Sequence, residues 1–308
     1  MIVVEPSFEF QDKLDAAGIA VRLEACGRIC YKSEDKITED SAVPFVKRLA
    51  SYGHNSVLEM AVVTVQVDCT EQEAGRFFAL QPKFLVVDQY QGGLLLTGSV
   101  RSFRELGKRC PDAGAVRAAI ALLAERHPWL YEGIYEAGAA VDPAIRVRKV
   151  RLDEVESLPD ELLMRHRYMG VKFIVNRAVS HELVRHRTCS FLQESQRYCN
   201  YNREKFGGQV SFVRPVFFRE GSEEYRIWLA AMQEAEARYL KLLETSSPQA
   251  ARTVLPNSCK TEIIVYCSLE EWRHIIRLRT PKNADPSMRE IMLGAAEEFA
   301  GRYAVMGG

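Results

Sequence analysis

The stretch RHRTCSFLQESQRY, residues 185–198, gathers side chains that bind anions. Its arginines are Arg185, Arg187 and Arg197. Arginine keeps its charge in proteins, and its planar fork matches two oxygens of a phosphate or carboxylate at once. Ser190 and Ser195 add neutral hydroxyls, and the amide of Gln193 can both donate to and accept from a base edge. Charge, hydroxyl and amide together predict a nucleotide site.

Two features of the same stretch favour a plainer interpretation. Arginines at a helix C-terminus interact favourably with the helix dipole, and Glu194 could pair with Arg187 or Arg197 on the surface. Because residues two apart on a helix point in different directions, a bend after Arg187 is needed to bring Arg197 back. The tripeptide also occurs as Arg165-His166-Arg167, without the serine or the third arginine. We expect this second copy to be a solvated helix end.

The composition describes a globular protein. Of the 308 residues, 47% are hydrophobic and 27% are charged, close to the average of soluble domains. The counts of Lys+Arg and Asp+Glu are both 41, so no net charge attracts nucleic acid or an anionic membrane. No leader peptide and no apolar run of bilayer length is visible. We therefore expect a cytoplasmic protein without a nucleic-acid or membrane partner.

The cysteines and histidines do not predict a metal site. Eight cysteines are scattered over the chain, which indicates reduced thiols, and Cys26 and Cys30 lack the further ligands of a zinc site. The chain has no HExxH, P-loop, GxGxxG or Gly-x-Ser-x-Gly motif. Cys189 and Cys199 lie near the arginine motif but not in the context of an activated thiol, so we expect them to be packing residues.

Helical and alternating patterns that follow one another predict an α+β fold. The expected strands are 1–4, 61–67, 94–96, 168–175, 210–213 and 262–267. The expected helices are 18–31, 40–52, 99–106, 113–127, 176–186, 220–243, 269–278 and 287–303. The motif therefore begins at the end of one helix, and a mixed run of charges at 146–161 is expected to be an exposed connection.

The spacing of RHR, seven residues and a serine resembles the signature of the flavin-dependent thymidylate synthases. Further stretches resemble that family in the same order: GHNSVLE at 53–59, VNRAVSHELVRHR at 175–187, ARTVLP at 251–256 and SLEEWRHIIRLR at 268–279, before MREI. The resemblance implies an α+β fold with a mixed sheet and long flanking helices. It also implies a homotetramer whose active sites lie between subunits.

The same resemblance implies the chemistry and its residues. Family members bind FAD and dUMP and transfer a one-carbon unit from methylenetetrahydrofolate to uracil C5, with NADPH reducing the flavin. The implied flavin residues are His54, Ser56, Arg101, Arg185, His186, Arg187, Thr188, Gln193, Ser268 and His274. The implied nucleotide residues are Glu182, Arg185, Gln193, Ser195, Gln196, Arg197, Arg252 and Arg279.

Arg279 is the implied catalytic residue, placed at the uracil ring. Uracil C5 is a poor nucleophile, and a fixed cation beside the N3–O4 edge stabilises the negative charge that activates it. The flavin supplies hydride chemistry, which side chains cannot. The plainer interpretation of Arg279 is a salt bridge to Glu290 or Asp285.

Some positions depart from the family's usual residues. They are Ser99, Leu192, Ser268, His274 and Asp285. We expect one domain over residues 1–308, with a mainly helical insertion at about 70–160. Two alternatives stay open: a flavin-dependent methylase of another uridine nucleotide, and a non-catalytic nucleotide- or RNA-binding homologue. The nucleotide- or RNA-binding alternative treats residues 165–187 as one basic helix that binds the ligand, and the neutral net charge of the chain is evidence against it.

Overall fold

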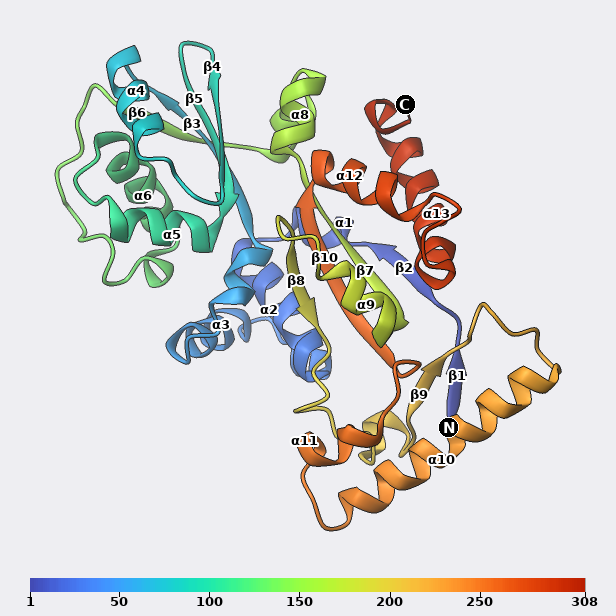
Figure 1. Cartoon of the computed structure of the whole chain (residues 1–308). Helices are drawn as coiled ribbons and strands as arrows, with labels where there is room; N and C mark the ends of the chain where they lie inside the picture. Colours follow the sequence, from blue (N-terminus) through green and yellow to red (C-terminus); the bar gives the residue numbers. More distant parts are fainter. Residues whose placement is uncertain (308) are drawn as a thin grey trace. The chain divides into compact units, whose positions relative to one another are not determined.

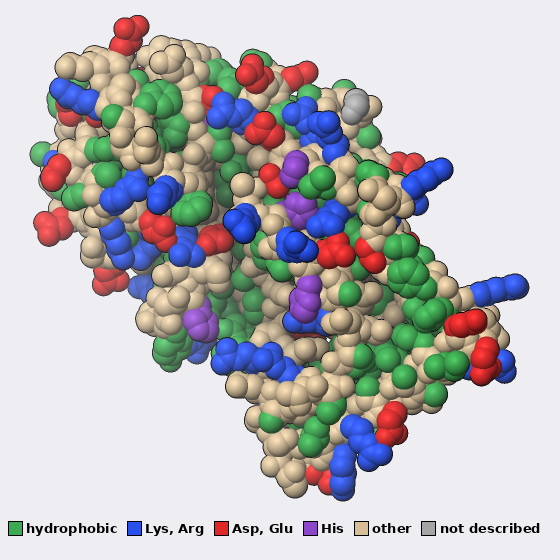
Figure 2. Space-filling view, viewed as in Figure 1, with side chains coloured by type: hydrophobic (Ala, Val, Ile, Leu, Met, Phe, Trp, Pro, Cys, Tyr) green, Lys and Arg blue, Asp and Glu red, His purple; other side chains and the backbone are tan. Residues whose placement is uncertain are grey.

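The computed structural model describes residues 1–307, apart from the side chain of Lys205. The chain forms two compact units: residues 1–15, 25–37 and 169 onward make unit 1, and residues 16–24 and 38–168 make unit 2. Both units mix helices and strands (Figure 1), which confirms the expected α+β class. Acidic and basic side chains are interspersed over the face shown in Figure 2, as their equal numbers lead one to expect.

Unit 1 is built on a four-stranded sheet of order β2-β7-β10-β8. Its strands are β2 (Ser7–Phe10), β7 (Tyr168–Asn176), β10 (Lys260–Ser268) and β8 (Ser190–Gln193). β2 is antiparallel to β7, and β8 is antiparallel to β10 with Gln193 opposite Ile263. The central strand β10 is buried from Thr261 to Cys267, and its residues 263–267 form a continuous apolar run.

Helices follow directly on these strands. They are α9 (Arg177–Leu183), α10 (Glu223–Leu243), α11 (Pro248–Ala251), α12 (Leu269–Arg279) and α13 (Pro286–Arg302). Asn176 caps α9 by accepting from the Val179 amide, and Ser268 caps α12 by accepting from the Glu271 amide. In both cases the last residue of a strand therefore begins the next helix.

A second core lies beneath the long helix α10. Trp228, Met232 and Tyr239 of this helix pack with a cluster that includes Phe212 and Cys259. The short parallel pair β1 (Ile2–Val4) and β9 (Ser211–Val213) borders it.

Unit 2 contains a sheet of order β4-β5-β3-β6. Its strands are β3 (Val62–Asp68), β4 (Leu85–Tyr90), β5 (Gly93–Ser99) and β6 (Arg146–Val150). β4 and β5 form a hairpin whose two turn residues, Gln91 and Gly92, both have positive φ (48° and 78°). This is the backbone that two-residue hairpins prefer, because its twist matches that of the strands.

Several helices of unit 2 contact this sheet and others complete the unit. They include α3 (Ala42–Ser51), α4 (Glu71–Ala79), α5 (Val100–Arg109), α6 (Gly114–Arg126), α7 (Leu152–Glu156) and α8 (Asp160–His166). α6 packs against β3, β6, α4 and α5. In α2 (Ile19–Tyr31), residues 19–24 belong to unit 2 and residues 25–31 belong to unit 1.

The structure corrects several of the expected elements. The expected set lacked the strands β2, β4, β6 and β8. The charged run at 146–161, expected to be an exposed connection, forms β6, α7 and the start of α8, and the stretch at about 70–160 is less helical than predicted. Strands β4 and β6 lie at the edges of their sheet and carry polar residues, Asp88 and Gln89 in β4 and three basic residues in β6, which weakens the apolar signal of a strand. Residues 165–187 form the end of α8, all of β7 and then α9, so the single basic helix of the RNA-binding alternative is wrong.

Candidate functional site

A cavity of about 520 Å³ in unit 1 brings the start of the arginine motif to α12. Its lining consists of Arg185, His186, Arg187, Thr188, Glu271, His274, Leu278 and Arg279. Six of these are residues that the sequence analysis assigned to a flavin or nucleotide. Arginines 185 and 187 are exposed here, whereas His186 between them is buried.

The chain turns sharply where the motif begins. α9 ends at Leu183, and the amides of Arg185 and His186 donate to the carbonyls of Glu182 and Leu183 at 3.3 and 3.1 Å. The next residues enter β8, which is fixed by its pairing with β10. The turn is what allows Arg185 and Arg187 to reach solvent while His186 points inward.

Arg279, at the end of α12, is held by Glu182 of α9 and His186 of the turn that follows α9. Its Nε donates to His186 Nε2 at 3.2 Å, one terminal nitrogen donates to the Glu182 carboxylate, and the other donates to the Glu182 carbonyl at 3.2 Å. Arginine has five N–H donors, so two remain for a ligand. The guanidinium is thereby fixed before any substrate arrives.

The plainer interpretation of Arg279 proves wrong. Glu290 pairs with Arg214, and Asp285 accepts from the Ser287 and Met288 amides as the cap of α13. Neither acid is the partner of Arg279. The residue that does pair with it, Glu182, was assigned to the nucleotide site but not to this contact.

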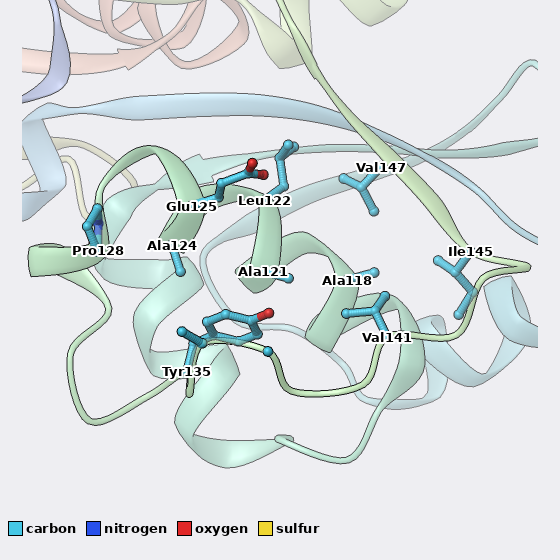
Figure 3. Close-up of a pocket in the computed structure, with 12 residues that line it drawn as sticks. Ala118, Ala121, Leu122, Ala124, Glu125, Pro128, Tyr135, Val141, Ile145 and Val147 are labelled. Carbon is cyan, nitrogen blue, oxygen red and sulfur yellow. The ribbon is translucent and has the colours of Figure 1, made fainter.

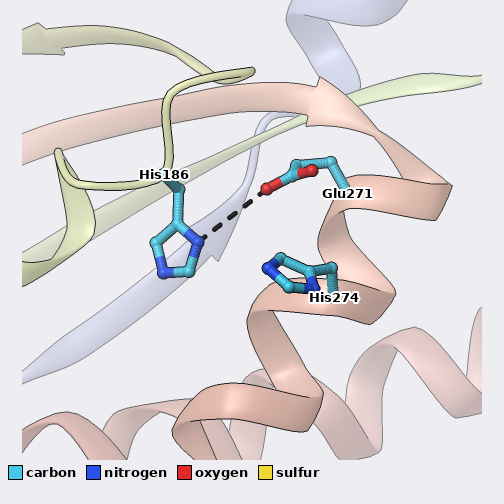
Figure 4. Close-up of side chains that lie close together, drawn as sticks. All are labelled: His186, Glu271 and His274. Carbon is cyan, nitrogen blue, oxygen red and sulfur yellow. Dashed lines mark ion pairs between the residues drawn. The ribbon is translucent and has the colours of Figure 1, made fainter.

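His186 is a neutral imidazole with a defined tautomer. Burial, together with Arg279 and His274, lowers its pKa to about 4, well below its ordinary value of 6.5. Because Nε2 accepts from Arg279, the ring proton stands on Nδ1, which lies 3.8 Å from Glu271 Oε1 (Figure 4). The ring of His274 meets that of His186 edge to face, with centroids 6.1 Å apart.

His186, Glu271 and His274 also have the spacing of a metal-binding group, with one ligand atom of each within 4.8 Å of the others. A metal ion between them would have to displace the Nδ1 proton of His186 while Arg279 still donates to the other ring nitrogen. A metal-bound histidine normally donates from its second nitrogen to an acceptor. The tautomer that Arg279 imposes on His186 therefore does not fit a metal ion at this group.

The later residues of the motif lie outside the lining of this cavity. Gln193 donates to the hydroxyls of Ser180 (2.8 Å) and Thr261 (3.1 Å), and Gln196 donates to Cys259 Sγ (3.3 Å). Arg197 donates to Gln249 at 3.3 Å, and the Ser195 hydroxyl accepts from the Arg197 amide at 3.4 Å. Arg252 begins a short 3-10 helix, Arg252–Val254. The grouping of these residues around one nucleotide stays a prediction.

Glu194, in the middle of the motif, is not a surface partner of the arginines. It is 1% exposed, and its carboxylate accepts from Tyr201 Oη at 2.7 Å and Lys260 Nζ at 2.9 Å. Lys260 also binds Glu262 at 2.7 Å, and Glu262 binds Lys32 at 2.6 Å. Burial opposes the charge of Glu262, but Lys260 and Lys32 outweigh it and lower its pKa to about 2. This buried network fixes the turn after β8.

In the second RHR copy His166 and Arg167 are buried, which corrects the interpretation of this copy as a solvated helix end. His166 is 1% exposed and lies between Thr97 Oγ1 (2.7 Å from Nδ1) and Asp88 Oδ2 (2.9 Å from Nε2). Arg165 also binds Asp88, while Arg167 binds Glu156. Burial lowers the pKa of His166, although Asp88 opposes the shift. In this copy the tripeptide anchors α8 within unit 2.

Three predicted flavin residues belong to unit 2. His54 and Ser56 are exposed at the start of a 3-10 helix, Asn55–Met60. Arg101, on the first turn of α5, pairs with Glu59 and Glu105, both at 2.6 Å. The hydrogen bond to Glu105 is the largest cause that raises the Arg101 pKa. The roles of all three residues stay predictions.

Glu271 and Leu278 also line the cavity, and neither was predicted from the sequence. Glu271 stands three residues before His274 on a helix, a spacing that places both on one face. That spacing was the available signal in the sequence.

None of the helices formed by residues 1–307 is both long enough and apolar enough to cross a bilayer.

Comparison with known proteins points to one family. The family model for the thymidylate synthase complementing protein, Thy1, matches residues 15–75 and 152–303 and leaves 76–151 unmatched. A flavin-dependent thymidylate synthase of Pyrococcus abyssi (strain GE5 / Orsay) is 35% identical over 128 residues, which are 41% of this chain and 52% of the relative. One from Corynebacterium aurimucosum is 35% identical over 133 residues, 38% of this chain and 51% of the relative.

The chain thus spans about half the length of the curated relatives it matches. Among solved structures, the chain is similar to a UMP/dUMP methylase, PolB from Streptomyces cacaoi, bound with 5-Br UMP. That similarity has a TM-score of 0.40 and 22% identity, and covers 46% of this chain and 73% of the other.

Proposed function

Because this chain belongs to the thymidylate synthase complementing protein family, we propose that it is a flavin-dependent methyltransferase that converts dUMP to dTMP. The proposed one-carbon donor is methylenetetrahydrofolate, and the proposed reductant of FAD is NADPH. The observation that carries the proposal is Arg279, fixed by Glu182 and His186 in a cavity that also holds Arg185 and Arg187.

The cavity residues fit an anionic, nucleotide-type ligand. Arg185, Arg187 and Thr188 are exposed at the cavity and offer charged and hydroxyl donors suited to phosphate. The volume of about 520 Å³ lies within the range of small-molecule sites. FAD, when bound, supplies the hydride transfer for which the protein has no side chain. His54, Ser56, Arg101, Gln193, Ser268 and His274 are its further proposed contacts.

Arg279 has the properties that activation of a uracil ring demands. Its two remaining donors can meet the N3–O4 edge, where negative charge must develop before C5 attacks an electrophilic carbon. Glu182 and His186 hold the guanidinium, so little reorganisation is required when the ring binds. The neutral state of His186 keeps a second positive charge from competing for the same edge.

The remaining family properties are proposals as well. We propose a cytoplasmic homotetramer with active sites between subunits, and a nucleotide subsite formed by Ser195, Gln196, Arg197 and Arg252. We also propose that one domain carries an insertion at about 70–160. The family model supports the insertion, because it passes over residues 76–151.

The test is anaerobic incubation of the full chain with FAD, NADPH, methylenetetrahydrofolate and either dUMP or UMP, followed by mass analysis of the nucleotide. The proposal expects dUMP to gain one methyl group and the flavin to bleach with NADPH. Methylation of UMP instead would support the alternative methylase of another uridine nucleotide. A protein that binds dUMP but neither binds FAD nor alters the nucleotide would support the non-catalytic homologue and overturn the proposal.

A further inference from the structure

The two units repeat one arrangement of strands. The unit 1 sheet has the order β2-β7-β10-β8, and the unit 2 sheet, taken from its other edge, has the order β6-β3-β5-β4. The edge pairs are antiparallel in both sheets: β2 with β7 and β8 with β10 in unit 1, and β6 with β3 and β4 with β5 in unit 2. Each strand of one sheet therefore has a counterpart in the other.

The helices follow and contact corresponding strands. After β7 the chain forms α9 and then β8, and after β3 it forms α4 and then β4. β10 leads through α12 to α13, just as β5 leads through α5 to α6. α9 contacts β10 as α4 contacts β5, and α13 contacts β2 as α6 contacts β6. The chain order differs only for the outer strand, because β2 comes before the rest of its sheet and β6 comes after the rest of its own.

α12 and α5 begin alike, which aligns their residues one by one. Ser268 and Ser99 are the caps, and each hydroxyl accepts from the amide three residues later, at 3.3 and 3.1 Å. The first, fourth and seventh residues after the cap are buried in both helices: Leu269, Trp272 and Ile275 in α12, and Val100, Phe103 and Leu106 in α5. By this alignment Arg279 corresponds to Cys110, which has no positive charge to offer a uracil ring.

The turn that carries the arginines in unit 1 has another composition in unit 2. α9 and α4 are again capped alike, by Asn176 and Thr70. Residues 184–189, VRHRTC, join α9 to β8, whereas residues 80–84, LQPKF, join α4 to β4. The second turn has a single cation, Lys83, and no hydroxyl. It therefore lacks the guanidinium forks that match two oxygens of a phosphate.

The connection between the next two strands differs as well. In unit 1, residues 194–259 join β8 to β10 and form α10 and α11. This connection carries four of the predicted nucleotide residues, Ser195, Gln196, Arg197 and Arg252. In unit 2, Gln91 and Gly92 alone join β4 to β5. The hairpin of unit 2 therefore leaves no place for that part of the nucleotide site.

The cavity of unit 2 is not the counterpart of the unit 1 cavity. It has a volume of about 480 Å³ and lies between α6 and the segment that leads to β6 (Figure 3). α6 corresponds to α13, and no residue of α13 lines the unit 1 cavity. The lining is mainly apolar, and its charged residue, Glu125, has the same sign of charge as a phosphate. This hollow is therefore unsuited to a nucleotide.

We propose that unit 2 is an internal copy of the unit 1 fold that has no nucleotide site of its own, so that the chain binds one nucleotide and not two. The copy keeps the helix caps and buried positions that the fold requires, and differs where unit 1 binds a ligand. Its elements β4, β5, α5, α6 and β6 lie in residues 76–151, which the family model leaves unmatched. The inference rests on the proposed function, which places the nucleotide in unit 1.

The test counts the nucleotides that bind. The full chain, loaded with FAD, is titrated with dUMP by calorimetry, with the protein concentration fixed by amino-acid analysis. We expect one dUMP per chain. Two dUMP per chain would overturn the inference and leave the proposed function intact, whereas no binding at all would overturn both.

Matched variants show which unit binds. The double variant Arg185→Ala/Arg279→Ala should weaken dUMP binding at least about tenfold, because charged hydrogen bonds are lost. Lys83→Ala removes the cation of the corresponding turn and should leave both affinity and stoichiometry unchanged. One dUMP that still binds the double variant with the original affinity, or a loss of binding in Lys83→Ala, would refute the inference.

Hydrogen exchange gives the same answer without a substitution. With FAD present throughout, dUMP should slow amide exchange at residues 185–188 and 271–279 and leave residues 80–84 and 105–110 unchanged. Slower exchange at both pairs of segments would show that the second copy binds nucleotide as well, and would overturn the inference.

Discussion

Replacing Glu262 by glutamine tests the buried charges that hold the motif. Glu262 is 9% exposed and accepts from Lys260 at 2.7 Å and Lys32 at 2.6 Å. Glutamine keeps the size of the side chain and one acceptor but removes the charge. Lys260, the residue that binds Glu194, would lose one of its two ionic partners.

The expected loss of stability follows from the Glu262 pKa. A fall from 4.5 to about 2 corresponds to about 3 kcal/mol at about 1.4 kcal/mol per unit, reduced to about 2 kcal/mol because solvent reaches part of the side chain. A carboxylate whose pKa is lowered on folding stabilises the protein above its unfolded pKa of about 4.5, and this stability is lost as the pH falls through 2. The difference in free energy of unfolding between wild type and variant should therefore fall, by pH 3, to less than half of its value at pH 7.

The assay needs a probe confined to unit 1. The chain has three tryptophans, and Trp129→Phe leaves Trp228 and Trp272, both in unit 1, as the fluorescent reporters. Denaturant unfolding at pH 7 and at pH 3 then gives, at each pH, the difference in free energy of unfolding between the protein with Glu262 and the Glu262→Gln variant. Glu223→Gln is the matched control, because Glu223 forms an exposed pair with Arg226 and should change stability little. A difference for Glu262→Gln that is negligible at pH 7, or equal at the two pH values, would refute the reasoning.

Three further predictions concern single side chains. Arg279→Ala should lower the rate at which methylated nucleotide forms at least about 100-fold, with the circular-dichroism spectrum unchanged. Arg277→Ala, which removes an exposed arginine of the same helix, is the control and should keep its activity. Equal losses of activity in the two variants would contradict the role of Arg279. Asp88→Asn removes the charge bound to Arg165 and should lower the free energy of unfolding by about 1–3 kcal/mol, seen as a lower unfolding midpoint by circular dichroism. Because the pKa of His186 is lowered from 6.5 to about 4, wild type should lose stability relative to His186→Gln as the pH falls through that range, and a constant difference would count against a neutral imidazole.

The elements that carry the site could be predicted because their signals are local. Ser268 caps α12, and Leu269, Trp272 and Ile275 recur at helical spacing, so the sequence shows both the start and the buried face of this helix. The uninterrupted apolar run of β10 likewise marks a central strand. These signals need no knowledge of distant residues.

What the sequence analysis missed depends on contacts between distant segments. β8 has only four residues, and its pairing with residues 263–266 is what makes it a strand. Glu194 was interpreted as a surface acid, since nothing nearby in the chain reveals that Tyr201 and Lys260 enclose it. The buried state of His166 depends in the same way on Asp88 and Thr97, which belong to strands of the unit 2 sheet.

The contacts around Glu194 also join segments that are far apart in the chain. Its amide donates to the Glu262 carbonyl at 2.8 Å, and the amide of Ser195 donates to the Cys30 carbonyl at 3.0 Å. Each amide is held by a hydrogen bond to a distant segment, β10 for Glu194 and α2 for Ser195, and separating β10 from the turn would expose the buried charge of Glu194. Their hydrogens should therefore exchange with deuterium only through cooperative opening of this whole region, which makes the middle of the motif a slow-exchanging part of the chain although it belongs to no helix or strand.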